Sequence, residues 1–216
     1  YKRQITNCVL HSRDSALKIG TETHGTIRNV TLSDCIIDRC SRAVGIWVRD
    51  GGTVEDIHIH HLTGSTLRYA DRYAEPGAPG WWGKGKPIFI SATPRKNSRT
   101  KTGTIRNVTF DNLSITCESC AFLAGEPESC LRDIRIRDLH MTFKRQGTQP
   151  GGLFDEQPSV RHVYSHAIPA LYARNVKQLT VQDSTVRYAD KSEAWASEVT
   201  TLEDCTESAV DLKKIQ

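Results

Sequence analysis

Aromatic and cationic side chains recur at matching positions of five short apolar segments in this sequence. Each segment alternates with a period of two, which is typical of a β-strand, so every second side chain is expected to face away from the core. Aromatic faces beside cations suit a polymer that has apolar surfaces and negative charge. The alternative is that other parts of the chain simply cover these side chains. The outward positions are predicted to form one column of Lys18, Trp47, Phe89, Leu123 and Tyr172, and a second of Arg49, Ser91 and Arg174.

Two long segments rich in Gly and Pro are predicted to be loops inserted at residues 65–86 and 144–168. Loops of this length inside a repeat are usually functional or disordered, and the pair Trp81 and Trp82 favours function in the first one. Indole rings hold sugar rings through their apolar faces. The alternative is that the two rings only pack the loop onto the column.

One eleven-residue pattern occurs five times, and it sets the architecture that must position these side chains. The copies are residues 27–37, 54–64, 105–115, 131–141 and 176–186, and a partial copy opens the chain. Their starts differ by 27 (54 − 27), 51 (105 − 54), 26 (131 − 105) and 45 (176 − 131) residues. Repetition at a fixed period indicates stacked units, with insertions in the two longer steps.

Each copy slips its apolar alternation by one residue, which predicts a bend between two short strands. Asp and Asn tolerate the left-handed backbone that such a corner requires. They occur just before the slip at Asn7, Asp34, Asn112, Asp138 and Asp183. A unit of strand, turn, strand, bend and strand predicts an all-β parallel β-helix of about seven coils.

The strands that precede each copy are expected to place one inward side chain per coil in a common core column. These side chains are Leu17, Ile46, Ile88, Phe122 and Leu171.

Composition agrees with a solenoid and excludes other classes. Only 38% of the 216 residues are hydrophobic, which suits the narrow core column of a single domain over residues 1–216. No apolar run approaches the ~20 residues that would span a membrane. The net charge of +4 is mild, the basic residues are scattered among acidic ones, and no nucleic-acid-binding module is recognisable. We therefore expect neither a membrane nor a nucleic acid as a partner.

The seven cysteines leave several interpretations open. Cys8 and Cys35 occupy the same inward position one coil apart, which predicts buried thiols. Two of the three residues Cys117, Cys120 and Cys130 would form a disulfide if the protein is secreted. A zinc site at these three cysteines would need a fourth ligand, which would be His140 or a distant residue. We expect no metal and no cofactor.

Three segments resemble family 28 glycoside hydrolases, the polygalacturonases and rhamnogalacturonan hydrolases. They are residues 15–22 (SALKIGTE), 27–35 (IRNVTLSDC) and 45–55 (GIWVRDGGTVE), and residues 81–90 (WWGKGKPIFI) are similar to a bacterial branch. The resemblance runs through most of the chain and is strongest over residues 4–64. It implies a right-handed parallel β-helix of the pectin-lyase-like type. It also implies a secreted or periplasmic enzyme that acts on an acidic plant-type polysaccharide or oligosaccharide.

The substrate motif Arg-Ile-Lys of that family falls on Trp47, Val48 and Arg49. The resemblance implies that Arg49 holds a uronate carboxylate, whereas Trp47 departs from the pattern and argues against a simple polygalacturonan. The family's Gly-His-Gly motif falls near Asp14, and its histidine is absent. The expected substrate-binding residues are Lys18, Trp47, Arg49, Phe89, Trp81, Trp82, Tyr172 and Arg174.

The family's catalytic aspartates lie on coils before Ser15, and the sequence begins at Tyr1, so we do not expect them in this chain. Inverting hydrolysis needs a carboxylic acid and a carboxylate about 6.5–9.5 Å apart. The acids left near the expected cleft are Asp14, Glu22 and Asp50, and they are the candidates for such a pair. Their alternative role is that of turn formers at strand ends.

Three functions are therefore open. A pectin-type hydrolase is favoured, and the others are a non-catalytic glycan-binding solenoid and a purely structural β-helix. A structural solenoid should not keep aromatic and cationic side chains aligned on one sheet. Residues 1–4 are too short to cover a coil, so we expect the N-terminal end to pair with another chain, another domain or upstream coils. We also expect negligible hydrolase activity from residues 1–216 alone.

Overall fold

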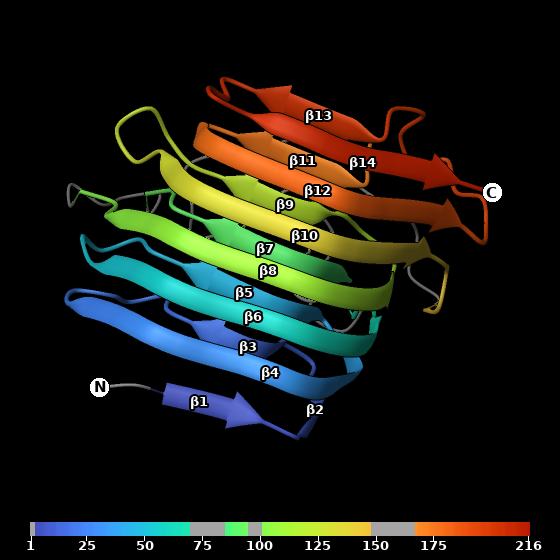
Figure 1. The fold of residues 1–216 in the computed structure, drawn as a ribbon, viewed down its shortest axis with the longest axis horizontal. Coiled ribbons are helices and arrows are strands. Elements are labelled where there is room, and N and C mark those ends of the chain that lie inside the picture. The colour runs from blue at the N-terminus through green and yellow to red at the C-terminus, as the bar shows by residue number, and fades with distance from the viewer. Residues whose placement is uncertain (1–2, 70–84, 95–100, 148–166) are drawn as a thin grey trace, which may run out of the picture.

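The computed structural model describes residues 3–69, 85–94, 101–147 and 167–216, which form two stacked β-sheets (Figure 1). No helix occurs in these ranges, and therefore none that could cross a membrane. Every pairing between named strands is parallel. From β2 onward the chain alternates between the two sheets, so the predicted parallel solenoid architecture is confirmed.

The long-strand sheet has the order β1-β4-β6-β8-β10-β12-β14, with β2 also paired to β4. Its strands are β1 (Arg3–Thr6), β2 (Val9–His11), β4 (Thr26–Cys40), β6 (Thr53–Thr66), β8 (Thr104–Cys117), β10 (Leu131–Phe143), β12 (Val176–Tyr188) and β14 (Ala209–Ile215).

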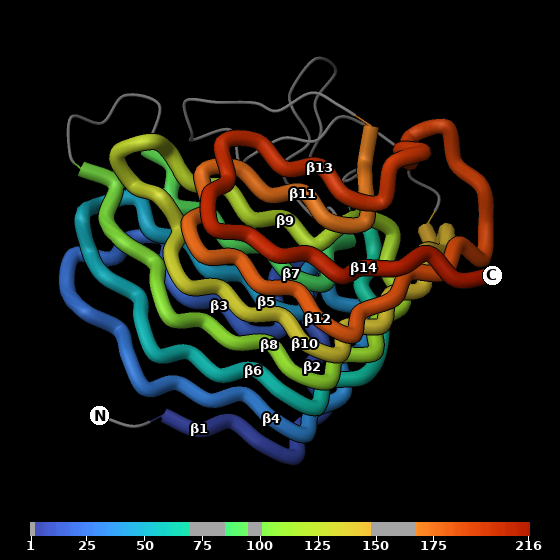
Figure 2. Tube along the Cα trace, turned by 45° about the horizontal axis from the view of Figure 1, so that its top comes forward, coloured from blue at the N-terminus to red at the C-terminus, as the bar shows by residue number. Residues whose placement is uncertain are grey.

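The short-strand sheet has the order β13-β11-β9-β7-β5-β3. Its strands are β3 (Ser15–Ile19), β5 (Arg42–Trp47), β7 (Lys86–Ser91), β9 (Ala121–Ala124), β11 (Leu171–Arg174) and β13 (Thr200–Glu203). The strand order follows the chain in both sheets, so β1 and β3 lie at one end of the stack and β13 and β14 at the other (Figure 2).

The long strands bend where Asp and Asn were predicted to form corners. All five predicted residues have a positive φ between 51° and 56°, and His61 (φ 54°) occupies the same position in β6. A residue with left-handed backbone turns the strand at this point. Asp and Asn adopt this conformation at a small energetic cost, which explains why they occupy the bend. The bend residues are Asn7, Asp34, Asn112, Asp138 and Asp183.

A second row of bends, five residues earlier in each copy, was not predicted from the sequence. Its members are again in left-handed backbone, and Asn107 Nδ2 donates to Asp56 Oδ1 of the preceding coil at 2.6 Å. The apolar alternation slips at this row as well, because buried apolar residues are three positions apart across it, as Val54 and Ile57 are, so the sequence carried a sign that was missed. The row consists of Asn29, Asp56, Asn107, Asp133 and Gln178.

The core lies between the two sheets as a continuous apolar column. In the long-strand sheet the predicted inward residues are buried, for example Leu32, Ile59 and Phe110 at 0–1% exposure, and these follow one another in register. Because each coil covers the next, a chain with few hydrophobic residues still buries a sizeable core.

The predicted core column of the short-strand sheet needs two corrections. Leu17 pairs with Val44 and not with Ile46, which lies opposite Ile19. Phe122 does not point into the core column, because it pairs with Phe89 and Tyr172. Leu17, Ile88 and Leu171 keep their predicted inward position.

The second correction has a simple physical cause. All four residues of β9 are apolar and all are buried, so the strand has no polar half that would fix which side chains face inward. For the same reason Leu123 belongs to the inner column with Ile90 and Ala173, and not to the outward one.

Candidate functional site

Four aromatic rings from successive strands of the short-strand sheet form a stack, which we call the aromatic ladder. The ring centroids are 4.9 Å apart for Trp47 and Phe89, 5.2 Å for Phe89 and Phe122, and 5.3 Å for Phe122 and Tyr172. The last two pairs are nearly parallel, with interplanar angles of 14° and 11°. Because neighbouring strands lie about 4.8 Å apart, parallel pairing itself brings such rings into contact.

Gly45 allows Trp47 to join the ladder. Gly45 holds the strand position between Lys18 and Phe89, and a β-carbon there would lie 2.3 Å from Cη2 and Cζ3 of Trp47. The indole therefore folds back over the glycine backbone and fills the place that a side chain would take. Trp47 thus reaches the predicted column although its backbone lies two residues further along.

Three cations lie over the faces of these rings. Lys18 Nζ is 5.3 Å from the Trp47 ring centroid, and the charged groups of Arg42 and Lys86 are 5.1 Å and 5.2 Å from that of Phe89. These distances are within the range of cation–π attraction. Aromatic and cationic side chains therefore lie together on one sheet, as predicted, although the sequence interpretation missed Arg42 and Lys86.

The aromatic ladder is buried, so the expectation that its rings face solvent is wrong. Trp47 and Tyr172 are 0% exposed and Phe89 is 1% exposed. All six residues of β7 are buried, as is usual for parallel strands that are covered on both faces. The part of these three residues in substrate binding stays a prediction.

The two predicted arginines are also engaged with the protein. Arg49 is fully buried, and its Nη1 donates to the carbonyl oxygen of Thr93 at 2.9 Å and to its Oγ1 at 2.5 Å. Arg174 is half-buried and lies 3.4 Å from the Glu203 carboxylate, which also accepts a hydrogen bond from Tyr172 at 3.0 Å. Burial, followed by the contact with Glu203, raises the pKa of the Tyr172 hydroxyl.

Trp81 and Trp82 lie outside the described residues, and their role stays a prediction. Among the predicted substrate-binding residues in the described ranges, Lys18 has the most exposed side chain, at 38%, and Arg174 follows at 32%.

Asp14 does not form a catalytic pair with either of the other two candidate acids. Asp14 precedes β3 and is held by Lys18 at 2.8 Å and Arg42 at 3.0 Å. Glu22 follows β3, and Asp50 lies near the same edge, since Gly52 donates its N–H to the Thr23 carbonyl. The five residues of β3 span about 16 Å, well beyond the roughly 6.5–9.5 Å of an inverting pair.

A cavity of about 860 Å³ opens at the end of the solenoid formed by β1 and β3. Its walls include inward apolar side chains of β1, β3 and β4, and three cations border it, Lys18, Arg3 and Arg28. Glu55 also borders it, but Arg106 Nη2 pairs with that carboxylate at 2.6 Å. The cavity therefore combines apolar walls with a net positive rim.

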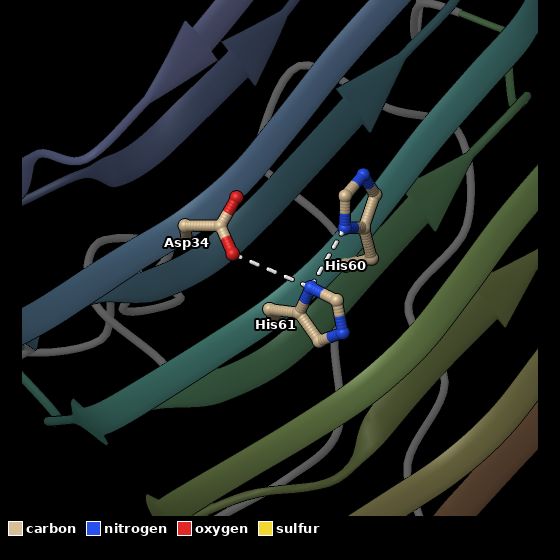
Figure 3. A group of neighbouring side chains, drawn as sticks. All are labelled: Asp34, His60 and His61. Atoms are coloured by element: carbon tan, nitrogen blue, oxygen red, sulfur yellow. Dashed lines mark hydrogen bonds and ion pairs between the residues drawn. The ribbon is translucent and has the colours of Figure 1, made fainter.

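A polar cluster on the long-strand sheet was not predicted at all. Asp34 of β4 and the neighbouring His60 and His61 of β6 point toward one another (Figure 3). Hydrogen bonding by Ser33 lowers the pKa of the Asp34 carboxyl, and the nearby imidazoles lower it further. The sequence carried one sign of this cluster, because His61 stands where the other copies have Asp or Asn.

All seven cysteines are free thiols. Cys8 and Cys35 are adjacent in the stack, as predicted, and donate to the Thr6 and Ser33 carbonyls. Cys35 is buried as expected, but Cys8 is only half-buried. Neither the disulfide nor the zinc site considered for Cys117 and its neighbours is present among the described residues. Burial raises the pKa of Cys40 to about 11, which marks it as an inert core thiol.

Comparison with known proteins gave no match, whether to family models, to curated proteins or to solved structures.

Proposed function

We propose that this chain is part of a pectin-type polysaccharide hydrolase whose right-handed β-helix, of about seven coils, binds an acidic glycan. The parallel architecture and the residues that resemble family 28 glycoside hydrolases support this proposal. In this proposal the chain is secreted or periplasmic and supplies glycan contacts.

The observation that carries the glycan part is the cavity of about 860 Å³ bordered by Lys18, Arg3 and Arg28. Its size is in the range of small-molecule sites, and apolar walls with a few charged groups are typical of them. Uronic acid residues offer both an apolar ring face and a carboxylate. A bond from a cation to such a carboxylate contributes about 1.5–3 kcal/mol.

The hydrolase part does not rest on acids of this chain. Asp14 is already paired with two cations, and the length of β3 separates it from Glu22 and Asp50. An inverting enzyme needs an acid on the leaving oxygen and a base that activates water on the other face of the ring. We therefore propose that residues 1–216 bind an oligouronide without cleaving it.

A second candidate, a non-catalytic structural β-helix, is favoured by the burial of the aromatic ladder and of Arg49. In that case the ladder only stabilises the stack. The cavity would then seat a polypeptide strand, because β1 and β3 are the edge strands of their sheets at this end.

Calorimetric titration of residues 1–216 with trigalacturonate tests the proposal, with neutral galactotriose as the ligand control. Lys18→Gln should weaken trigalacturonate binding about tenfold, the equivalent of ~1.4 kcal/mol. Lys177→Gln is a matched control, because Lys177 is also partly exposed and paired with a carboxylate. It should bind like the wild type.

Equal affinity for the charged and the neutral trisaccharide, or no effect of Lys18→Gln, would contradict the glycan site. A dimer in solution that dissociates when Ile5 is replaced by Asp would favour the strand-seating alternative. Release of reducing ends from pectin by residues 1–216 would refute the claim that the acids lie elsewhere.

A further inference from the structure

Asp34 and His61 occupy the same bend position in neighbouring coils. Both have left-handed backbone, and the residues on either side of them pair in register, Ser33 with His60 and Cys35 with Leu62. The bend therefore aims both side chains outward from adjacent strands. His60 precedes the bend on the same strand and reaches the same spot.

The three side chains bring one ligand atom each to a common point. His60 Nδ1 lies 3.1 Å from His61 Nδ1, and the latter lies 3.3 Å from Asp34 Oδ1. All three atoms lie within 4.8 Å of one another. A tetrahedral Zn²⁺ ion with bonds of about 2.0–2.1 Å holds its ligand atoms about 3.3–3.4 Å apart. Two of the three edges are thus close to the required length.

Hydrogen bonds alone do not account well for this arrangement. Nδ1 of His61 carries either one hydrogen or one lone pair in the ring plane. A single hydrogen would be divided between Asp34 and His60. Without it, the lone pair of His61 would face the Asp34 carboxylate. A cation would instead accept the lone pairs of all three atoms at once.

A neighbouring hydroxyl orients the carboxylate. Thr6 Oγ1 donates to Asp34 Oδ2 at 3.4 Å, which leaves Oδ1 directed at His61. Such outer contacts are what fix carboxylate ligands in metal sites. His61 also borders a hollow of about 380 Å³, so the site is open on one side. The other residues around this hollow are Asp111, Asn112, Arg137, Asp138 and Asp183.

We propose that Asp34, His60 and His61 bind a divalent transition-metal ion such as Zn²⁺, which joins β4 to β6. Two imidazoles and one carboxylate favour Zn²⁺, Ni²⁺ or Cu²⁺ over Mg²⁺ and Ca²⁺, which prefer oxygen ligands. Three protein ligands leave a coordination position for water or for an anionic ligand from the hollow. This inference is independent of the proposed glycan site, which lies elsewhere on the stack.

The test uses untagged protein titrated with Zn²⁺ and Ni²⁺ by calorimetry, and with Mg²⁺ as the negative control. His61→Asn and Asp34→Asn each remove a ligand and keep the bend, because Asn already occupies this position at Asn112. Each should weaken binding about tenfold or more. His58→Thr is the control, since His58 is exposed on the same strand and Thr31 and Thr109 flank it in register.

Co²⁺ absorption separates this site from the cysteines, because bound thiolates give an intense near-ultraviolet band and nitrogen and oxygen ligands do not. We expect one ion per chain without that band, lost in His61→Asn and retained in His58→Thr. Binding that persists in both ligand variants, a thiolate band, or no Zn²⁺ binding at millimolar concentration would overturn the proposal.

Discussion

Replacing Phe122 with Leu tests whether the aromatic ladder stabilises the solenoid through ring contacts rather than through burial alone. Phe122 is the ring with two stacked partners, Phe89 at 5.2 Å and Tyr172 at 5.3 Å. Lys86 Nζ also lies 4.7 Å from its centroid. Leucine keeps most of the apolar volume and removes all three interactions.

The expected loss follows from those three contacts. Each aromatic pair contributes roughly 0.5–1.5 kcal/mol beyond its buried area, and a buried cation–π contact adds about 1–2 kcal/mol. The volume change itself costs less than about 1.5 kcal/mol. Phe110→Leu is the matched control, because Phe110 is equally buried and has no ring partner among the described residues. The two ring pairs and the cation–π contact add up to about 2–5 kcal/mol, so the excess loss in Phe122→Leu should be at least about 2 kcal/mol.

Scanning calorimetry of both variants measures this excess. For a chain of this size, 1 kcal/mol corresponds to a Tm shift of about 2–4 °C, so Phe122→Leu should melt at least about 4 °C below Phe110→Leu. Equal melting temperatures would refute the argument, since burial alone would then explain the ladder.

Two further predictions concern buried and partly buried carboxylates. Glu118 is 1% exposed and accepts backbone N–H bonds from Arg68 at 2.6 Å and from Gly147 at 2.9 Å. Glu118→Gln should cost about 2 kcal/mol of stability, and hydrogen exchange at those two amides should become faster; unchanged exchange would contradict it. The Arg137 hydrogen bond lowers the pKa of Asp111, so Asp111 stabilises the fold above the pKa of about 3.9 that it has when unfolded. That contribution disappears as pH falls through the lower folded value. The Tm advantage of wild type over Asp111→Asn should therefore shrink below about pH 4, and a constant difference would count against this assignment.

The long-strand sheet was predictable because its repeat contains both polar and apolar positions. Alternation fixed which side chains face inward, and the slip after Asp34 and its counterparts located the bend. The earlier bend at Asn29 could have been located in the same way, because the apolar positions step by three residues from Ile27 to Val30, as they do from Leu32 to Cys35. A three-residue step between buried apolar positions is thus the sequence signal of both bends.

The short-strand sheet was harder to predict because it is buried on both faces. Because β7 and β9 are buried throughout, alternation indicates that the strands exist but not which side chains face the core or how the strands pair. The burial of the aromatic ladder was missed for the same reason, because the sequence pattern does not show that both faces of this sheet are covered. A side chain that points away from the core column is not necessarily exposed, because the rings of the ladder cover one another and cations lie over their faces.

The two sheets therefore offer different opportunities for function. On the short-strand sheet, stacking in register removes the aromatic faces from solvent, and Lys18 at the end of the row stays 38% exposed. On the long-strand sheet, each bend directs one polar side chain outward every coil, at a spacing set by strand pairing. One exchange of Asp or Asn for His at such a bend places an imidazole beside a carboxylate without disturbing the backbone. A solenoid can thus gain a ligand-binding cluster at the very positions that shape its corners, which is how His61 comes to lie beside Asp34.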